Sequence, residues 1–225
     1  MKKKKHKRVS NVERRSISLN AILGAAEHLF VTQRFHTTTI DQIAERANLT
    51  KGAVYFYFSD KTTILLKLIE RVETLIYKPV FETLKDSSVP PRERLVQFVH
   101  KLSRWGQTQR NALLLPIIIA PEFWGTRSPV EKKLRAMYDD FAQSMEQLID
   151  DGKAIGAFAN HAPTREMASV LVAMSDGMLL EWARRRNELD GSLYVAAARR
   201  FLLSGMTPAP ASSASAGSAK SKPAG

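Results

Sequence analysis

The sequence predicts an all-α protein in which a short unit of three helices precedes a larger helical unit. Apolar residues recur at spacings of three and four along most of the chain, which is the period of an amphipathic helix. No stretch alternates apolar and polar residues as a half-buried strand would, and the sequence shows no internal repeat. With 225 residues and 44% hydrophobic content, the chain is long enough to bury one small and one larger core.

The first element, residues 1–15, is predicted to be a disordered basic arm. It holds eight Lys or Arg residues against one Glu, which is more than half of the formal net charge of +12. Such an arm can be a solvated tail, bind nucleic-acid phosphates or bind an anionic membrane surface. The choice among these three depends on the segments that follow.

Two helices are predicted next. The first spans residues 16–30, where leucine, isoleucine, alanine and phenylalanine recur at helical spacing. A run of threonines then interrupts the pattern, and Thr39 stands where an N-cap belongs, directly before the next apolar stripe. The sequence therefore predicts a second helix over residues 40–47 with Thr39 as its cap.

A tight turn and a third helix follow. Asn48 tolerates the left-handed backbone conformation better than most residues, so it suits a turn that ends the second helix. Thr50 is placed to cap a short third helix over residues 51–57. Two helices on either side of a turn of three or four residues have the spacing of a helix-turn-helix motif.

Four consecutive aromatic residues, 55–58, end this third helix. At about 100° per residue, Val54 and Phe58 share one face and can enter the core. The opposite face is small at its N-terminal end and aromatic at its edges, which suits insertion into the major groove of DNA. We expect this outward face to comprise Gly52, Ala53 and Phe56, with Tyr55 and Tyr57 at its flanks.

Residues 37–65 read TTTIDQIAERANLTKGAVYFYFSDKTTIL, and this segment resembles the DNA-binding segment of the TetR family of bacterial one-component transcriptional regulators. The resemblance covers about residues 17–66. It rests on the threonine cap, the Ile-Ala pair, the Lys-Gly entry into the third helix, the Tyr-x-x-Phe ending and a following lysine. Asn48 departs from the family's usual Gly but tolerates the turn, and Tyr57 departs from a frequent His but keeps a hydrogen-bond donor.

The resemblance assigns roles to residues of this segment, with a double-stranded DNA operator as the partner. It implies that Thr39 and Gln42 touch the DNA backbone or the groove edge. It implies major-groove contacts for Thr50, Lys51, Gly52, Ala53 and Phe56, and phosphate contacts for Tyr55, Tyr57 and Lys61.

The rest of the chain predicts further helices and a tail. With Ser59 or Asp60 as its cap, a long helix continues to about Lys78, and Pro79 marks a boundary. Apolar stripes predict later helices over about 95–105, 112–120, 130–150, 165–186 and 192–203. The last segment is rich in Pro, Ala, Ser and Gly, which predicts disorder. The predicted division is an arm at 1–15, a helix-turn-helix DNA-binding domain at 16–60, a helical effector-binding and dimerisation domain at 61–205, and a disordered tail at 206–225.

Residues 166–183 are apolar around most of the helix circumference, with Asp176 and Glu181 as the main interruptions. A helix that is apolar on all sides must be covered on all sides. One side can meet its own core and another a second subunit, so the sequence predicts a homodimer. The family resemblance implies that the last two helices of each subunit form a four-helix bundle, and two-fold symmetry then favours a pseudo-palindromic operator.

The resemblance also implies a pocket for a small-molecule effector in the larger unit. Large, adaptable apolar side chains are frequent there and favour a largely apolar or aromatic effector, although any one of them is more typical of core packing. We expect Pro116 and the connection 120–129 to break helices and leave a gap for the ligand. The candidate ligand-binding residues are Trp105, Phe123, Trp124, Met137, Tyr138, Phe141, Met174 and Met178.

These features predict a ligand-responsive DNA-binding transcriptional regulator. Repression is the usual outcome in the family, so the first expectation is a dimeric repressor that an effector releases from its operator by favouring a form with the DNA-reading heads further apart. The sequence does not exclude activation, and it fixes neither the operator nor the effector.

Other classes of function have less support in the sequence. The absence of cysteine excludes disulfides, zinc thiolate sites and a cysteine nucleophile, and it fits a reducing cytoplasm. No catalytic motif, glycine-rich phosphate loop or histidine pair with metal-ligand spacing occurs, so we expect no enzyme, cofactor or metal. The apolar stretch 112–120 is too short to span a bilayer. The remaining alternatives are a polybasic membrane-surface protein, a non-specific DNA-binding protein and, with least support, a helical enzyme.

Overall fold

A computed structural model describes residues 11–185 and 188–208 of the chain, and every regular element in these ranges is a helix. The all-α fold predicted from the sequence is therefore confirmed. None of the helices in these ranges is long and apolar enough to cross a bilayer. The elements are α1 (Asn11–Gln33), α2 (Ile40–Arg46), α3 (Lys51–Tyr57), α4 (Lys61–Val72), η1 (Glu73–Tyr77), α5 (Lys78–Lys85), α6 (Pro91–Thr108), α7 (Arg110–Phe123), α8 (Pro129–Ala154), α9 (Thr164–Arg185) and α10 (Gly191–Met206).

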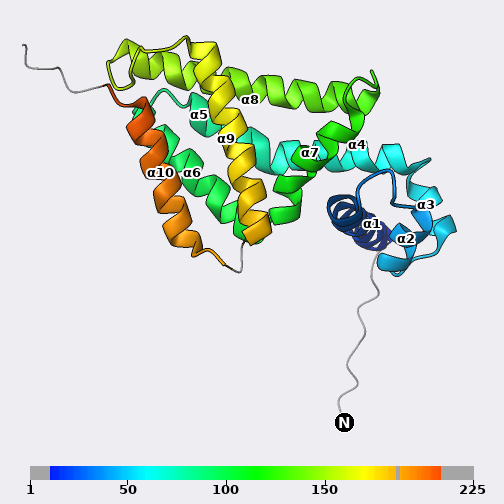
Figure 1. The fold of residues 1–225 in the computed structure, drawn as a ribbon. Coiled ribbons are helices and arrows are strands. Elements are labelled where there is room, and N and C mark those ends of the chain that lie inside the picture. The colour runs from blue at the N-terminus through cyan, green and yellow to red at the C-terminus, as the bar shows by residue number, and fades with distance from the viewer. Residues whose placement is uncertain (1–10, 186–187, 209–225) are drawn as a thin grey trace, which may run out of the picture.

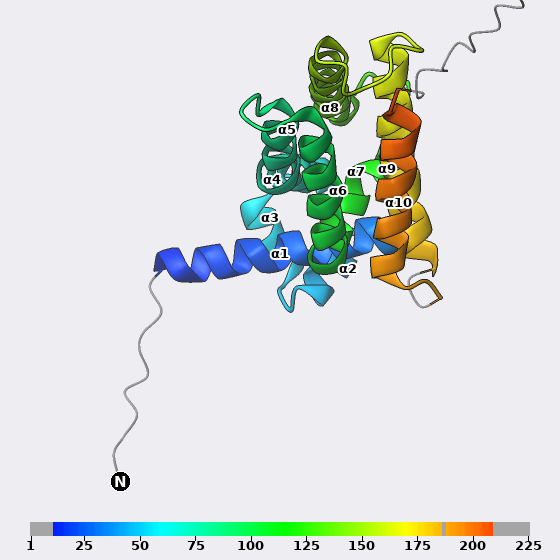
Figure 2. The same ribbon diagram turned by 90° about the vertical axis from the view of Figure 1, so that its left-hand side faces the viewer.

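The helices form a small unit and a larger one (Figure 1). Helices α1 to α3 lie together at one end of the molecule, and α4 leads from them into the larger unit. Helices α9 and α10 lie side by side along one face of the larger unit, as both ribbon views show (Figures 1 and 2). One continuous set of buried apolar side chains runs through both units, and α7 packs on both α1 and α4. The small unit is therefore seated directly on α7.

Helix α1 already includes Asn11, the first residue that the structure describes, so it extends further toward the N-terminus than the predicted start at Ser16. Its N-terminal turns project beyond the rest of the molecule (Figure 2), and their side chains are exposed. The prediction relied on apolar periodicity, whereas Glu13, Arg14 and Arg15 extend the helix through their own helical propensity. The remainder of the predicted arm and most of the predicted tail lie outside the described residues.

The sequence predicts that the long helix after α3 ends at about Lys78, before Pro79. In the structure, helical backbone continues through Pro79. A π-helical turn, η1, follows α4 directly, and α5 continues with Pro79 in its first turn. Proline lacks an amide hydrogen, and its ring crowds a carbonyl of the preceding helical turn. The wider π-turn lies where that crowding would occur, so the chain changes its helical geometry and keeps its direction.

Helix α7 also continues through prolines. Pro116 and Pro121 both lie inside it, so the expected break at Pro116 is wrong. The helix is buried over most of its length, from Ala112 through Pro116 and again at Ile119. Burial of several aliphatic side chains, at about 1.5–3 kcal/mol each, offsets a proline penalty of about 3 kcal/mol.

Candidate DNA-binding site and effector pocket

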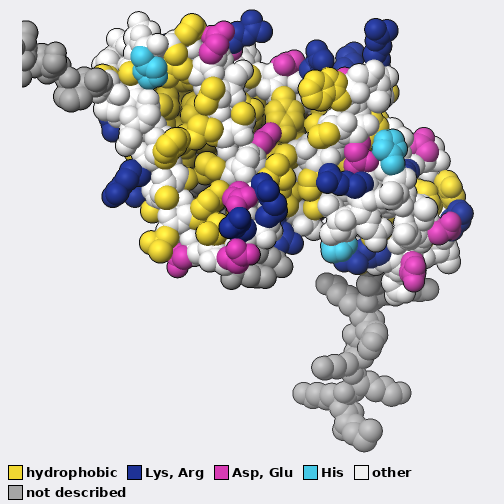
Figure 3. All heavy atoms as spheres, in the orientation of Figure 1, with side chains coloured by type: hydrophobic (Ala, Val, Ile, Leu, Met, Phe, Trp, Pro, Cys, Tyr) yellow, Lys and Arg dark blue, Asp and Glu magenta, His cyan; other side chains and the backbone are white. Residues whose placement is uncertain are grey.

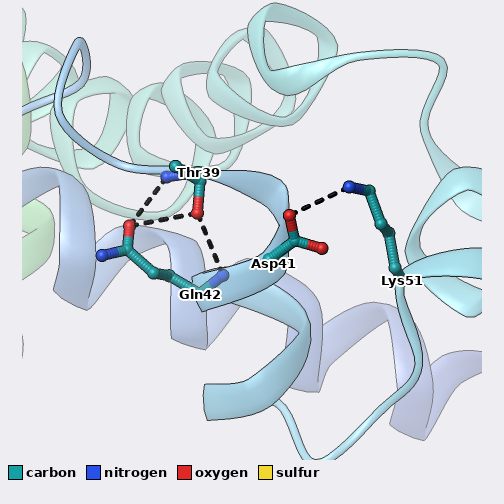
Figure 4. Close-up of polar contacts among 4 residues, drawn as sticks. All are labelled: Thr39, Asp41, Gln42 and Lys51. Atoms are coloured by element: carbon teal, nitrogen blue, oxygen red, sulfur yellow. Dashed lines mark hydrogen bonds and ion pairs between the residues drawn. The ribbon is translucent and has the colours of Figure 1, made fainter.

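The second helix is positioned by a capping box at its N-terminus (Figure 4). The Gln42 amide N–H donates to the Thr39 hydroxyl oxygen at 3.2 Å, and the Thr39 amide N–H donates to Gln42 Oε1 at 2.8 Å. These two bonds satisfy donors that a helix end would otherwise leave free. The amide nitrogen of the Gln42 side chain points away from Thr39, which leaves its donors available for another partner.

The turn between α2 and α3 has the predicted geometry. Asn48 has a φ of 54°, in the left-handed region, and the Leu49 amide donates to the carbonyl of Ala44 at 2.9 Å. Thr50 then caps α3, since its hydroxyl oxygen accepts from the Ala53 amide at 3.1 Å. Each of these bonds lies within a few residues along the chain, so local sequence sets the angle at which α3 leaves the turn.

Helix α3 has the two faces that its sequence predicts. Val54 and Phe58 are buried against the small core, whereas Phe56 is 77% exposed and its ring stands edge-on to that of Tyr57. Tyr55 is also exposed, as is Gly52. A helix that exposes a large aromatic ring beside a bare glycine presents an apolar surface with room for close approach.

Lys51 at the start of α3 is tied to α2. Its ammonium lies 2.9 Å from Asp41 Oδ2, and both side chains remain more than half exposed (Figure 4). The hydrogen bond and the charge of Asp41 raise the pKa of Lys51. An exposed pair of this kind contributes little to stability, so Lys51 can exchange Asp41 for a phosphate.

Lys61 does not have the place that the family resemblance implied. Its ammonium donates to the carbonyls of Phe35 and Thr38, each at 2.6 Å, and lies 4.3 Å from the centre of the Phe35 ring. Burial lowers the pKa of this lysine. Because its donors are directed at the turn between α1 and α2, Lys61 braces that turn and is not free to grip a phosphate.

The same turn is held from the other side by α7. Glu122 accepts hydrogen bonds from the amides of Phe35 and His36, both at 3.1 Å. The Phe35 ring packs on Phe123 at 5.1 Å between centroids, and the His36 ring stacks on Phe123 at 5.8 Å. We name this contact of residues 35–36 with residues 122–123 the α7 clamp, and it joins the two units. No residue near Glu122 in the chain indicates this role, because its partners lie more than eighty residues earlier.

The predicted ligand-binding residues do not gather around one cavity. Phe123, Met137 and Phe141 are buried in the core, and Trp105 is partly buried against it. Trp124 is 84% exposed on the surface, so it is not a pocket residue in this structure. These positions correct the prediction, since aromatic and methionine stripes at helical spacing here serve mainly as core.

Tyr138 takes part in a polar contact between α8 and α9. Its hydroxyl donates to Asp176 Oδ2 at 3.0 Å. Burial raises the pKa of Asp176 to about 6, and the hydrogen bond from Tyr138 opposes that rise in part. Asp176, the polar residue that interrupts the apolar surface of α9, therefore points toward α8.

An apolar pocket lies between α6, α9 and α10, away from Pro116 and the connection 120–129. Its cavity volume is about 60 Å³, and the pocket is partly open to solvent. Met174 and Met178 line it, as predicted, together with Phe98, Trp182 and Tyr194. Tyr194 and the α6 residue Phe98 were not predicted, because only the folded chain brings residues that far apart in sequence to one cavity.

Comparison with known proteins identifies the class of protein that this fold and helix-turn-helix define. The model of bacterial regulatory proteins of the tetR family matches residues 22–68. The chain is 28% identical over 172 residues to the transcriptional repressor BepR of Brucella suis biovar 1 (strain 1330), covering 76% of this chain and 82% of BepR. The crystal structure of the MbdR regulator from Azoarcus sp. CIB is 39% identical with a TM-score of 0.76, covering 84% of this chain and 98% of that one.

The protein is thus a DNA-binding transcriptional regulator. It belongs to the TetR family. The same fold also occurs in the regulator FadR from Bacillus subtilis in complex with stearoyl-CoA, which is 19% identical with a TM-score of 0.65 and covers 83% of this chain and 98% of its own.

Proposed function

We propose that this protein is a repressor that binds a pseudo-palindromic operator as a homodimer and leaves it when a small, largely apolar or aromatic effector enters the pocket between α6, α9 and α10. The exposed outer face of α3 carries the proposal. A face with an exposed Phe ring and a bare Gly, held at a fixed angle by two capped helix starts, is shaped for a major groove. Its site of action is the bacterial cytoplasm, where the DNA lies.

The proposed DNA contacts follow from exposure and from free donors. Thr39 and the free amide donors of the Gln42 side chain contact the DNA backbone and the edge of the groove. Phosphates are met by the tyrosine hydroxyls and bases by the face of α3, whereas Lys61 acts indirectly by bracing the turn before α2. The proposed contact residues are Thr39, Gln42, Thr50, Lys51, Gly52, Ala53, Tyr55, Phe56 and Tyr57.

The proposed dimer uses α9 and α10. Val170, Leu193 and Phe201 on these helices are exposed, and a groove of about 750 Å³ lined largely by apolar residues runs between them. Hydrophobic side chains gather over this part of the surface (Figure 3). Apolar surface of that extent on a water-facing pair of helices is stabilised by a second copy, which also supplies the second α3.

The proposed division of labour places DNA reading in the part of the chain up to residue 60 and effector binding and dimerisation in residues 61–205. The α7 clamp connects the two. Since α6, α7 and α8 pack on one another, an effector that separates α6 from α9 and α10 changes the seating of α7, and Glu122 carries the change to the turn between α1 and α2. A differential affinity of about 2–3 kcal/mol for the separated form shifts operator occupancy by one to two orders of magnitude.

An operator selection tests this function. Purified protein is mixed with a random duplex pool at about physiological salt, and the retained DNA is sequenced. We expect a pseudo-palindrome whose half-sites lie about one helical turn or a multiple of it apart, and light scattering at micromolar concentration should give a dimer. Recovery of unselective, salt-sensitive DNA alone would identify the protein as a non-specific DNA binder and contradict the proposal.

A further inference from the structure

The apolar pocket adjoins a second, polar hollow. This hollow has a volume of about 510 Å³, is open to solvent, and is lined by Glu27, Trp182 and residues 106–111. The two spaces share Gly106, Gln107 and Trp182 in their walls. A ligand that passes Trp182 can therefore lie in both.

Trp182 lies at this border beside two glycines, and of these Gly191 leaves no room for a side chain. A Cβ atom added at Gly191 would lie 2.9 Å from Cη2 of the indole, and one added at Gly106 would lie 4.0 Å from Cδ1. The opposite partner is Tyr194, whose ring stacks on the indole at 6.0 Å between centroids with an interplanar angle of 22°. The stacked rings of Trp182 and Tyr194 therefore form an aromatic wall against which the apolar part of a ligand can pack.

Glu27 gives the polar hollow its character. It comes from α1, the first helix of the DNA-reading unit, and its half-buried carboxylate makes no hydrogen bond or ion pair with any residue that the structure describes. Burial raises the pKa of Glu27, and the charge of Arg71 opposes that rise. A carboxylate withdrawn from water without a hydrogen-bond donor is costly, so a ligand that supplies a donor gains more there than at the surface.

We propose that the effector is an amphipathic molecule with an apolar body between α6, α9 and α10 and a positively charged, hydrogen-bond-donating head, such as an ammonium group, at Glu27. This inference rests on the effector pocket proposed above and specifies its ligand. The head group then contacts α1 itself, so ligand binding acts on the DNA-reading unit by a route separate from the α7 clamp.

Arg110 lines the same hollow and offers the opposite charge. Two features favour Glu27 as the determinant of the head group. Glu27 is withdrawn from water far enough for burial to dominate its pKa, and the cation that acts on its carboxyl is Arg71, which does not line the hollow. An anionic head group is the alternative that the experiment must separate.

Three probes with one body and different heads separate these cases: 4-phenylbutylamine, 4-phenylbutanol and 4-phenylbutyrate. Dissociation constants are measured by titration calorimetry on the full-length dimer, and binding at the wall is followed by Trp182 fluorescence in a variant with Trp105→Phe and Trp124→Phe. The variant Glu27→Gln keeps the shape of the side chain and removes its charge. Glu45→Gln, an exposed position on α2 that does not line the hollow, is the matched control.

We expect the amine to bind about tenfold more tightly than the alcohol, and the carboxylate to bind most weakly. Glu27→Gln should remove the advantage of the amine and leave the alcohol within about twofold, while Glu45→Gln should change neither. Equal binding of all three probes, or tightest binding of 4-phenylbutyrate, would overturn the head-group proposal and leave the pocket intact. If none of the three binds at millimolar concentration or changes the Trp182 signal, both the head group and the effector pocket are wrong.

Discussion

The DNA-reading unit and the larger unit, in which we propose the effector binds, differ in the sequence distance over which the residues of their candidate sites meet. In the former, Thr39 pairs with Gln42 and Thr50 with Ala53, each three residues apart. In the latter, Phe98 of α6, Met178 of α9 and Tyr194 of α10 line one pocket. Local bonds fix the shape of the first site, whereas packing of distant helices creates the second.

That difference changes what a single substitution does. A residue on the outer face of α3 touches little of its own protein, so its replacement alters recognition and leaves the fold in place. A buried residue in the larger unit is surrounded by neighbours from other helices, so its replacement first lowers the stability of the fold. Two glycines, one in each unit, make this contrast measurable.

Gly52→Glu should produce the largest change in function. The position is exposed, and the nearest atom to an added Cβ would be the Thr50 hydroxyl oxygen at 4.0 Å. A carboxylate in the first turn of α3 favours the helix but, in the proposed complex, would face the phosphates and base edges of DNA. We expect operator affinity to fall about 100-fold or more, with an unchanged or slightly higher Tm.

The matched control is Gly24→Glu on α1, which adds the same charge to the same unit at another open position. It should weaken operator binding by less than about tenfold. Equal loss in both variants would mean that net charge, and not the face of α3, governs binding.

Gly152→Ala should produce the largest change in stability. A Cβ at this position would overlap the buried ring of Phe158. The Phe158 amide also donates to the Gly152 carbonyl, which fixes the chain at the end of α8. Because the ring cannot move without opening the core, we expect a loss of about 2–4 kcal/mol in the free energy of unfolding. Gly24→Ala, at an open helical position, should instead gain about 0.5–1 kcal/mol in denaturant titrations.

The contrast between the two units also explains what the sequence predicts well. Caps at Thr39 and Thr50, the left-handed turn at Asn48 and the inward placement of Val54 all depend on neighbours in the chain, and the structure has each of them as predicted. The order of the helices was also predictable, because the apolar period is a local property. Boundaries shifted where charged residues with high helical propensity extend a helix without adding to the apolar stripe.

The failed predictions depend on distant partners. Pro116 breaks an isolated helix, yet in α7 burial on every side keeps the helix continuous. Lys61 carries a charge suited to phosphate, but the carbonyls of Phe35 and Thr38 take its donors. Trp124 was assigned to the pocket by its type and lies on the surface, while the role of Glu122 depends on a turn more than eighty residues earlier in the chain.

Asp176→Asn should reveal a pH dependence that arises in the larger unit. The carboxyl has an ordinary pKa of 3.8 and a folded-state pKa of about 6 because burial disfavours its charge. As pH rises from about 4 to 6, the unfolded chain releases this proton while the folded chain keeps it, so the wild-type protein loses stability across that window. The loss persists above pH 6.

Asn cannot ionise, and its Oδ1 still accepts from the Tyr138 hydroxyl. The stability of the variant relative to wild type should therefore improve by about 1–3 kcal/mol between pH 4 and pH 7.5, as measured by denaturant unfolding at both values. An identical difference at the two pH values would show that the carboxyl does not titrate abnormally in the folded protein.

The smallest expected change lies where the two units meet. In Glu122→Gln, one of the two carboxylate oxygens becomes an NH₂ group, which cannot accept from the amides of both Phe35 and His36. A charge-assisted bond is lost from the α7 clamp, and we expect the turn of residues 34–38 to open more easily by about 1–2 kcal/mol while global stability changes less. Amide hydrogen exchange at Phe35 and His36 should accelerate about tenfold, with unchanged exchange in the core of α8. Exchange that accelerates equally in both places would mean that the clamp is part of one cooperative fold, and that the two units do not open separately.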